Sequence, residues 1–188
     1  GGTIHLGGDW QGQGDTPTSE YAYVGQNAIL NARADEEGDG GEVVVWSDVA
    51  TGFFGLITAK GGANSGNGGS VETSSKGNLQ AYGNVDASAA NGLGGEWLLD
   101  PDNLTVIAGA PGLVDATNAA NVITASGNAT ASTVTNQTIQ NALNGGSSVT
   151  LRTHDNNNAE QGDITVNATI TKSAGGNATL RMESHDDV

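Results

Sequence analysis

Clusters of acidic side chains are the first residues in this sequence that could do chemistry. They comprise Asp35, Glu36, Glu37 and Asp39; Asp100, Asp102 and Asn103; and residues 155–158 with Glu160 and Asp163. Calcium takes six to eight oxygen ligands, which alternating carboxylates in a turn can supply. The first cluster resembles the start of a calcium loop, but its twelfth position is Trp46 instead of Glu. We therefore expect solvated acidic turns and no metal site.

Paired carboxylates could also cleave polysaccharides, because glycoside hydrolysis needs an acid and a second carboxylate across a groove. Lyase chemistry on uronates needs a basic residue as well, and the chain has only 6 Lys and Arg. His5, His154 and His185 are isolated from one another in sequence. The chain contains no nucleophile elbow, phosphate-binding loop or cysteine. We expect no catalytic residues, no cofactor and no enzyme activity.

Sequons for glycosylation are another modification signal. They begin at Asn103, Asn128, Asn136, Asn167 and Asn177. Several would arise by chance in a chain this rich in Asn and Thr, so the sequence leaves their use open.

A repeated Gly-Gly pair indicates the elements that position these residues. The pairs are Gly1-Gly2, Gly40-Gly41, Gly68-Gly69 and Gly94-Gly95, each followed by a short β-forming run. A repeat this short cannot bury its own apolar face, so its copies must stack. Residues 51–59 align without gaps with residues 79–87, with apolar side chains at alternate positions. The pattern predicts an all-β parallel solenoid whose core column contains Ile4, Val43, Val45, Ile57, Ala59, Val71 and Val85.

Composition and charge agree with such a fold and exclude several partners. Thirty glycines and 4% aromatic residues leave little to fill a conventional globular core in 188 residues. The net charge of −15 repels phosphate backbones and anionic lipids, so we expect no nucleic-acid partner and no membrane insertion. The absence of cysteine is consistent with an exported protein.

One structural domain is predicted, in three stretches. Residues 1–107 form coils with the Gly-Gly repeat, residues 108–148 an irregular insertion and a short helix, and residues 149–188 further coils. The helix has Thr135 as its N-cap, Ile139 and Leu143 on one face, and a stop at Gly145-Gly146. A bulge somewhere in residues 12–20 must leave the first coil. Because the chain begins and ends inside its own pattern, we expect a fragment of a longer protein.

Three aromatic residues are predicted to point out of the solenoid. Trp97 has the inward parity of Val43, whereas Trp46 has the opposite parity, and Phe54 and Tyr82 share one outward column. Outward rings form either a carbohydrate platform or the seat of a flanking loop. Trp46, Phe54 and Tyr82 are our predicted ligand-binding residues.

Several stretches of the chain share a pattern with one family of proteins. They are residues 53–63, 68–74, 85–89 and 97–101, with further likeness at residues 7–12 and 162–166 and weaker likeness over residues 108–134. In these stretches the chain resembles the filamentous-haemagglutinin-like exoproteins of two-partner secretion in Gram-negative bacteria. The resemblance implies a right-handed parallel β-helix exported through an outer-membrane partner barrel. The chain has no Asn-Pro-Asn secretion motif, so we expect that transporter to engage a region outside these residues.

The resemblance also implies a function. We expect a secreted adhesin or biofilm-matrix protein, at the outer cell surface or in the extracellular matrix, with this part forming a rod-like shaft. The shaft would mediate or support attachment between cells or to surfaces, with a host or matrix carbohydrate or a cell-surface receptor as partner. The alternative is a polysaccharide-degrading β-helix enzyme, and a third possibility is a spacer that binds nothing.

Overall fold

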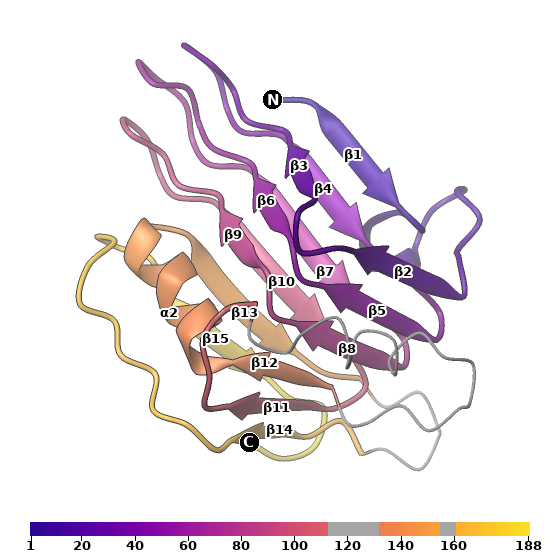
Figure 1. Ribbon diagram of the computed structural model, residues 1–188. Coiled ribbons are helices and arrows are strands. Elements are labelled where there is room, and N and C mark those ends of the chain that lie inside the picture. Colours follow the sequence, from indigo (N-terminus) through magenta and orange to yellow (C-terminus); the bar gives the residue numbers. More distant parts are fainter. Residues whose placement is uncertain (113–131, 155–160) are drawn as a thin grey trace.

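Parallel strands in three sheets form the framework of the chain, which a computed structural model describes over residues 1–112, 132–154 and 161–188 (Figure 1). Sheet A has the order β1 (Thr3–Leu6), β4 (Glu42–Val45), β7 (Ser70–Ser74), β10 (Glu96–Asp100), β13 (Ser148–Arg152) and β15 (Leu180–Glu183). Sheet B has the order β14 (Ile164–Val166), β11 (Leu104–Ile107), β12 (Thr133–Thr135), β8 (Asn78–Ala81), β5 (Ala50–Phe53) and β2 (Tyr21–Val24). Sheet C contains β3 (Ile29–Asn31), β6 (Leu56–Thr58) and β9 (Asn84–Asp86).

The strands pair in the register that the repeat predicts. Each of the first three repeat units supplies one strand to each sheet, and equivalent strands of successive units are parallel neighbours. Val43 pairs with Val71, and Ile57 pairs with Val85. The predicted alignment and the mostly β character of the chain are therefore confirmed.

Close approach between successive units explains why both residues of the second, third and fourth Gly-Gly pairs are glycine. A Cβ atom on Gly41 would lie 1.8 Å from the carbonyl oxygen of Gly2. A Cβ atom on Gly68 would lie 1.8 Å from the carbonyl oxygen of Ala87. Any larger residue would push the units apart, because a neighbouring backbone cannot rotate away as a side chain can.

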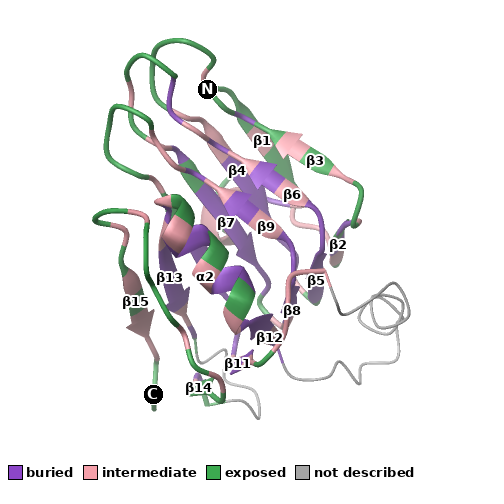
Figure 2. Cartoon of the chain, turned by 60° about the vertical axis from the view of Figure 1, so that its left-hand side comes forward, coloured by how far each residue is buried: buried purple, intermediate pink, exposed green. Residues whose placement is uncertain are grey.

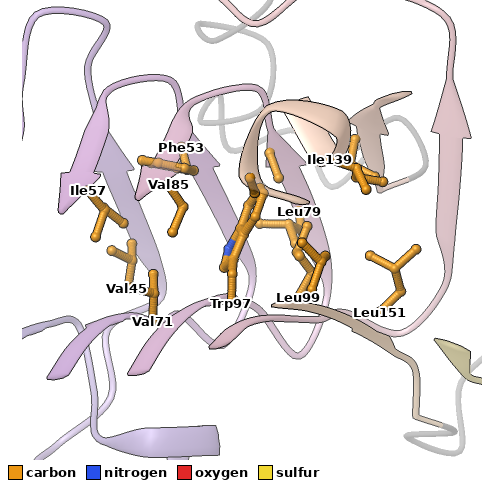
Figure 3. Close-up of a cluster of buried hydrophobic side chains, with 14 of the residues drawn as sticks. Val45, Phe53, Ile57, Val71, Leu79, Val85, Trp97, Leu99, Ile139 and Leu151 are labelled. Atoms are coloured by element: carbon orange, nitrogen blue, oxygen red, sulfur yellow. The ribbon is translucent and has the colours of Figure 1, made fainter. Parts of the chain in front are cut away.

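The core lies between the three sheets and consists of side chains at alternate strand positions (Figure 3). All the predicted column residues belong to it, with Ile4 partly buried against the others. Trp97 is the largest fully buried side chain: its ring meets Phe53 edge-on at 6.2 Å, and its Nε1 donates to Thr73 Oγ1 at 3.0 Å. The predicted inward direction of Trp97 is thus confirmed.

The single predicted helix is also confirmed, as α2 (Asn136–Gly145). Thr135 Oγ1 accepts a hydrogen bond from Thr138 N, and Gly146 ends the helix with a φ of 101°. Ile139 and Leu143 are buried in the core. The helix packs against β9, where the next strand of sheet C would otherwise lie (Figure 2). No helix in the described residues is long and apolar enough to cross a membrane.

One strand was not predicted. Residues 108–148 were expected to hold an irregular insertion and a helix, yet β12 at Thr133–Thr135 pairs with both β8 and β11. Sheet B therefore gains an extra strand between the third and fourth repeat units. A three-residue strand with Val134 as its one aliphatic residue gives too little alternation to be recognised in sequence. Residues 113–131, which belong to the expected irregular segment, lie outside the described residues.

Candidate functional site

A surface segment that we call the strap, residues 7–20, covers part of the outer face of sheet A. It contains a short 3-10 turn, η1 (Trp10–Gly12), and it is the bulge expected in the first unit. Its glycines pack on the indole of Trp46: a Cβ atom on Gly8 would lie 2.6 Å from Trp46 Cδ1, and one on Gly12 2.5 Å from Cε2. Trp46 is only 5% exposed. It points outward as predicted, but it lies beneath the strap, where a sugar cannot stack on it.

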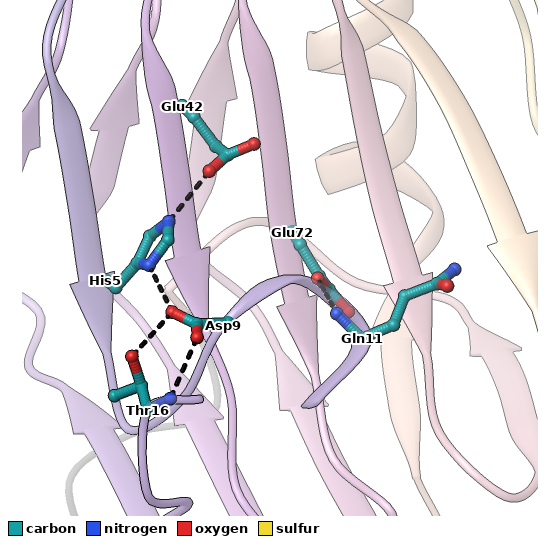
Figure 4. Close-up of polar contacts among 6 residues, drawn as sticks. All are labelled: His5, Asp9, Gln11, Thr16, Glu42 and Glu72. Atoms are coloured by element: carbon teal, nitrogen blue, oxygen red, sulfur yellow. Dashed lines mark hydrogen bonds and ion pairs between the residues drawn. The ribbon is translucent and has the colours of Figure 1, made fainter. Parts of the chain in front are cut away.

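Hydrogen bonds around His5 hold the start of the strap (Figure 4). His5 Nδ1 lies 2.8 Å from Asp9 Oδ1, and His5 Nε2 lies 2.7 Å from Glu42 Oε1. Asp9 also accepts hydrogen bonds from the amide and the hydroxyl of Thr16. The hydrogen bond to Glu42 raises the pKa of His5, because the protonated ring can donate from both nitrogens. The backbone hydrogen bond from Thr16 is the main cause that lowers the pKa of Asp9.

A buried carboxyl group lies beneath the middle of the strap. Glu72 on β7 is completely buried, and its Oε2 accepts a hydrogen bond from Gln11 N at 2.8 Å (Figure 4). No described group hydrogen-bonds to its Oε1. Burial raises the pKa of Glu72 from its ordinary value of 4.5 to about 7, despite the opposing hydrogen bond from Gln11. With a pKa of about 7, the Glu72 carboxyl group changes from protonated to charged near neutral pH.

A second buried carboxyl group, Asp100 on the adjacent strand β10, adds a repulsion that helps raise the pKa of Glu72. His154 Nδ1 lies 2.6 Å from Asp100 Oδ1, and no described group hydrogen-bonds to Asp100 Oδ2. Burial raises the pKa of Asp100, against the attraction of His154 and Arg152. Arg152 itself pairs with Glu183 at 2.8 Å. Glu72 and Asp100 both occupy outward positions of their strands, and only their burial distinguishes them from solvated residues.

The other two predicted ligand residues lie on the outer face of sheet B. The rings of Phe54 and Tyr82 stack with centroids 5.8 Å apart, and Tyr23 tilts against Phe54 at 5.6 Å. The predicted outward column is confirmed, but Phe54 is only 6% and Tyr82 only 3% exposed, partly because Ile107 packs against them. Tyr23 was not predicted and is 44% exposed. The structure does not bring Trp46 together with this column.

The acidic turns are engaged in local contacts. Asp35 pairs with Arg33 at 3.2 Å, and Asp39 accepts a hydrogen bond from Asn67 N at 2.7 Å. In the described ranges, no three His, Cys, Asp or Glu side chains are placed to hold a metal ion. Residues 155–158 and Glu160 of the third acidic cluster lie outside those ranges.

The sequons fall into two groups. Asn103 accepts hydrogen bonds from the amides of Gly162 and Asp163, and Asn136 Nδ2 donates to a backbone carbonyl, so a glycan at either residue would break these contacts. Asn167 and Asn177 are exposed. Asn128 is outside the described residues.

Comparison with known proteins leaves the resemblance untested. No protein-family model matches the chain, and a search of curated proteins finds no relative. The function must therefore be argued from the residues and their arrangement.

Proposed function

We propose that this chain is a right-handed parallel β-helix that forms the rod-like shaft of a secreted bacterial surface adhesin or biofilm-matrix protein. The observation that supports this most strongly is the in-register stacking of repeated units. Thr3, Glu42, Ser70, Glu96 and Ser148 are successive partners across sheet A. Because each unit contacts only its neighbours, further units can be added at the ends, and the protein becomes longer without becoming wider.

The surface chemistry suits an extended shaft. About half of the exposed residues in the described part of the chain are Asn, Ser, Thr, Asp or Glu. A net charge of −15 keeps such a surface soluble and discourages rods from associating. The same charge disfavours nucleic acid and anionic membranes as partners. Export by an outer-membrane partner barrel and a place at the outer cell surface or in the matrix follow from the family resemblance and belong to the proposal.

A polysaccharide-degrading enzyme is the alternative, and one observation favours it. Glu72 has a raised pKa and lies near Asp100, as a general acid and its partner carboxylate would. However, Glu72 is completely buried, because Gln11 and the rest of the strap cover it. Its carboxyl group is therefore not accessible to a substrate. A substrate could reach it only after the strap had moved, so we propose a shaft without catalytic activity.

The proposal is tested by coating beads with the folded chain and counting their attachment to Gram-negative cells and to films of matrix polysaccharide. A chain of the same composition in scrambled order, with the same net charge, is the matched control. We expect attachment by the folded chain above this control and no new reducing ends or unsaturated products from the polysaccharide. Attachment equal to that of the control would contradict an adhesive role, and turnover of the polysaccharide would favour the enzyme.

A further inference from the structure

A groove of about 430 Å³ lies where sheets B and C meet, beside the aromatic column. Its apolar wall includes Phe54, Leu56 and Ile29, and the Ile29 side chain is 64% exposed. Its polar wall carries the side-chain amides of Gln26 and Asn27, and Asn84 reaches it from the third repeat unit. The volume is within the range of small-molecule binding sites.

Like a groove of about 380 Å³ that includes Leu93 and Asn177, this groove carries no charge. None of its lining residues, all in the described part of the chain, is ionisable, although the protein carries a net charge of −15. A groove of similar size, about 440 Å³, is lined by Arg33, Asp35 and Lys60 instead. A charged ligand would find no opposite charge in this groove and would lose hydration on entering it. The groove therefore favours an uncharged ligand.

The amide groups are available and partly held in place. Asn84 Oδ1 accepts a hydrogen bond from Asn141 Nδ2 at 3.2 Å, which leaves the Asn84 Nδ2 group to donate to a ligand. Within the described residues, the side chains of Gln26 and Asn27 have no hydrogen-bond partner, and each can both donate and accept. On the other wall the Ile29 side chain offers the exposed apolar surface, whereas Phe54 packs against Tyr23 and Tyr82 and exposes only 6%.

We propose that this groove binds a neutral oligosaccharide. A sugar ring offers an apolar face of C–H groups beside a rim of hydroxyl groups, which matches an apolar wall facing uncharged amides. Neutral sugars also suit a protein whose acidic surface repels uronates and sulfated glycans at a distance. The inference rests on the proposed attachment function, because it names the class of ligand through which the shaft would attach.

The test uses the whole chain and defined probes: neutral oligomers of glucose, galactose, mannose and N-acetylglucosamine, with oligogalacturonate as the acidic comparison. Saturation-transfer NMR identifies binders, and calorimetry then gives their Kd. The double variant Gln26→Ala/Asn27→Ala removes exposed amides only, and Ile29→Ala removes the exposed apolar side chain of the other wall. Gln13→Ala/Asn64→Ala makes the same chemical change at exposed positions outside the groove.

We expect at least one neutral oligosaccharide to bind, with Kd raised about tenfold or more by each groove variant and unchanged by the control. Thermal melts establish that Ile29→Ala is folded, and the double variant stands as the test if it is not. Binding of no neutral probe, preference for oligogalacturonate, or an unchanged Kd in the double variant would overturn the inference. Attachment of beads that persists in the groove variants would overturn it while leaving the proposed function intact. Oligosaccharide binding without bead attachment would contradict the proposed function alone.

Discussion

Replacing Glu72 by Gln should stabilise this protein above neutral pH and leave its stability unchanged in acid. The carboxyl group is completely buried under the strap, and burial raises its pKa from 4.5 to about 7. Gln has nearly the same shape, and its carbonyl oxygen can still accept the hydrogen bond from Gln11 N. The substitution therefore removes the charge and keeps the packing.

The direction in which stability changes with pH follows from the protonation of the Glu72 carboxyl group in the folded and the unfolded chain. Below pH 4.5 it is protonated whether the chain is folded or unfolded, so it contributes no pH dependence. Between pH 4.5 and about 7 the unfolded chain loses this proton while the folded chain keeps it, and stability falls as pH rises. Above pH 7 the loss is complete and amounts to about 3 kcal/mol.

The expected gain for Glu72→Gln at pH 8 is therefore up to about 3 kcal/mol, or roughly 6 to 12 °C in Tm for a chain of this size. Urea unfolding followed by circular dichroism at pH 4 and pH 8 measures it. Glu20→Gln, the same change at an exposed position, should shift the free energy of unfolding by less than about 0.5 kcal/mol at both values. An equal loss of stability by Glu72→Gln at pH 4 and pH 8 would refute the reasoning, because it would mean that the charged form is favoured in the fold.

The remaining predictions concern the core, the glycine pairs, the strap and calcium. Ile57→Asp should unfold the chain and Ile57→Ala should cost about 2 to 5 kcal/mol in a denaturant titration, since the side chain is fully buried; a normal melt for Ile57→Asp would contradict the register. Gly41→Ala should lower Tm strongly while Gly2→Ala, whose Cβ would meet nothing within 4 Å, should not; equal effects would argue against close stacking. His5→Gln should speed amide hydrogen exchange in the strap more at pH 5 than at pH 9. The raised pKa of His5 means that its stabilising effect is lost as pH rises. A larger effect at pH 9 would exclude ion pairs of His5 with Asp9 and Glu42. Tm should be the same in millimolar calcium and in chelator, and a rise of several degrees with calcium would reveal a bound ion.

Pairing between repeat units could be predicted because its signals are local. The partners Val43 and Val71 follow equivalent Gly-Gly pairs, so parity alone fixes which residues face inward. The helix could be predicted because Thr135 and Gly146 are adjacent to it and act on its own backbone.

The site residues were harder to predict because their environment depends on contacts that are distant in sequence. Glu72 is buried by Gln11, which lies 61 residues away, and nothing near Glu72 in the sequence signals that cover. Trp46 and Phe54 were expected to point outward, and they do, but parity cannot tell whether another segment will then cover them. Strand β12 gives almost no alternation in sequence. Its partners β8 and β11 lie on either side of it in sheet B, and β8 is distant in sequence.

The most direct test of the stacked shaft is a set of distances between spin labels placed along one row of sheet A. Thr3, Ser70 and Ser148 occupy the first, third and fifth strands of that row. At about 4.8 Å per strand, the backbone positions of Thr3 and Ser148 should be about 19 Å apart, and those of Thr3 and Ser70 about half that. Paramagnetic resonance should give narrow distributions in this ratio, lengthened only by the label arms. A broad distribution, or a Thr3 to Ser148 distance no longer than the Thr3 to Ser70 distance, would contradict the stacked shaft.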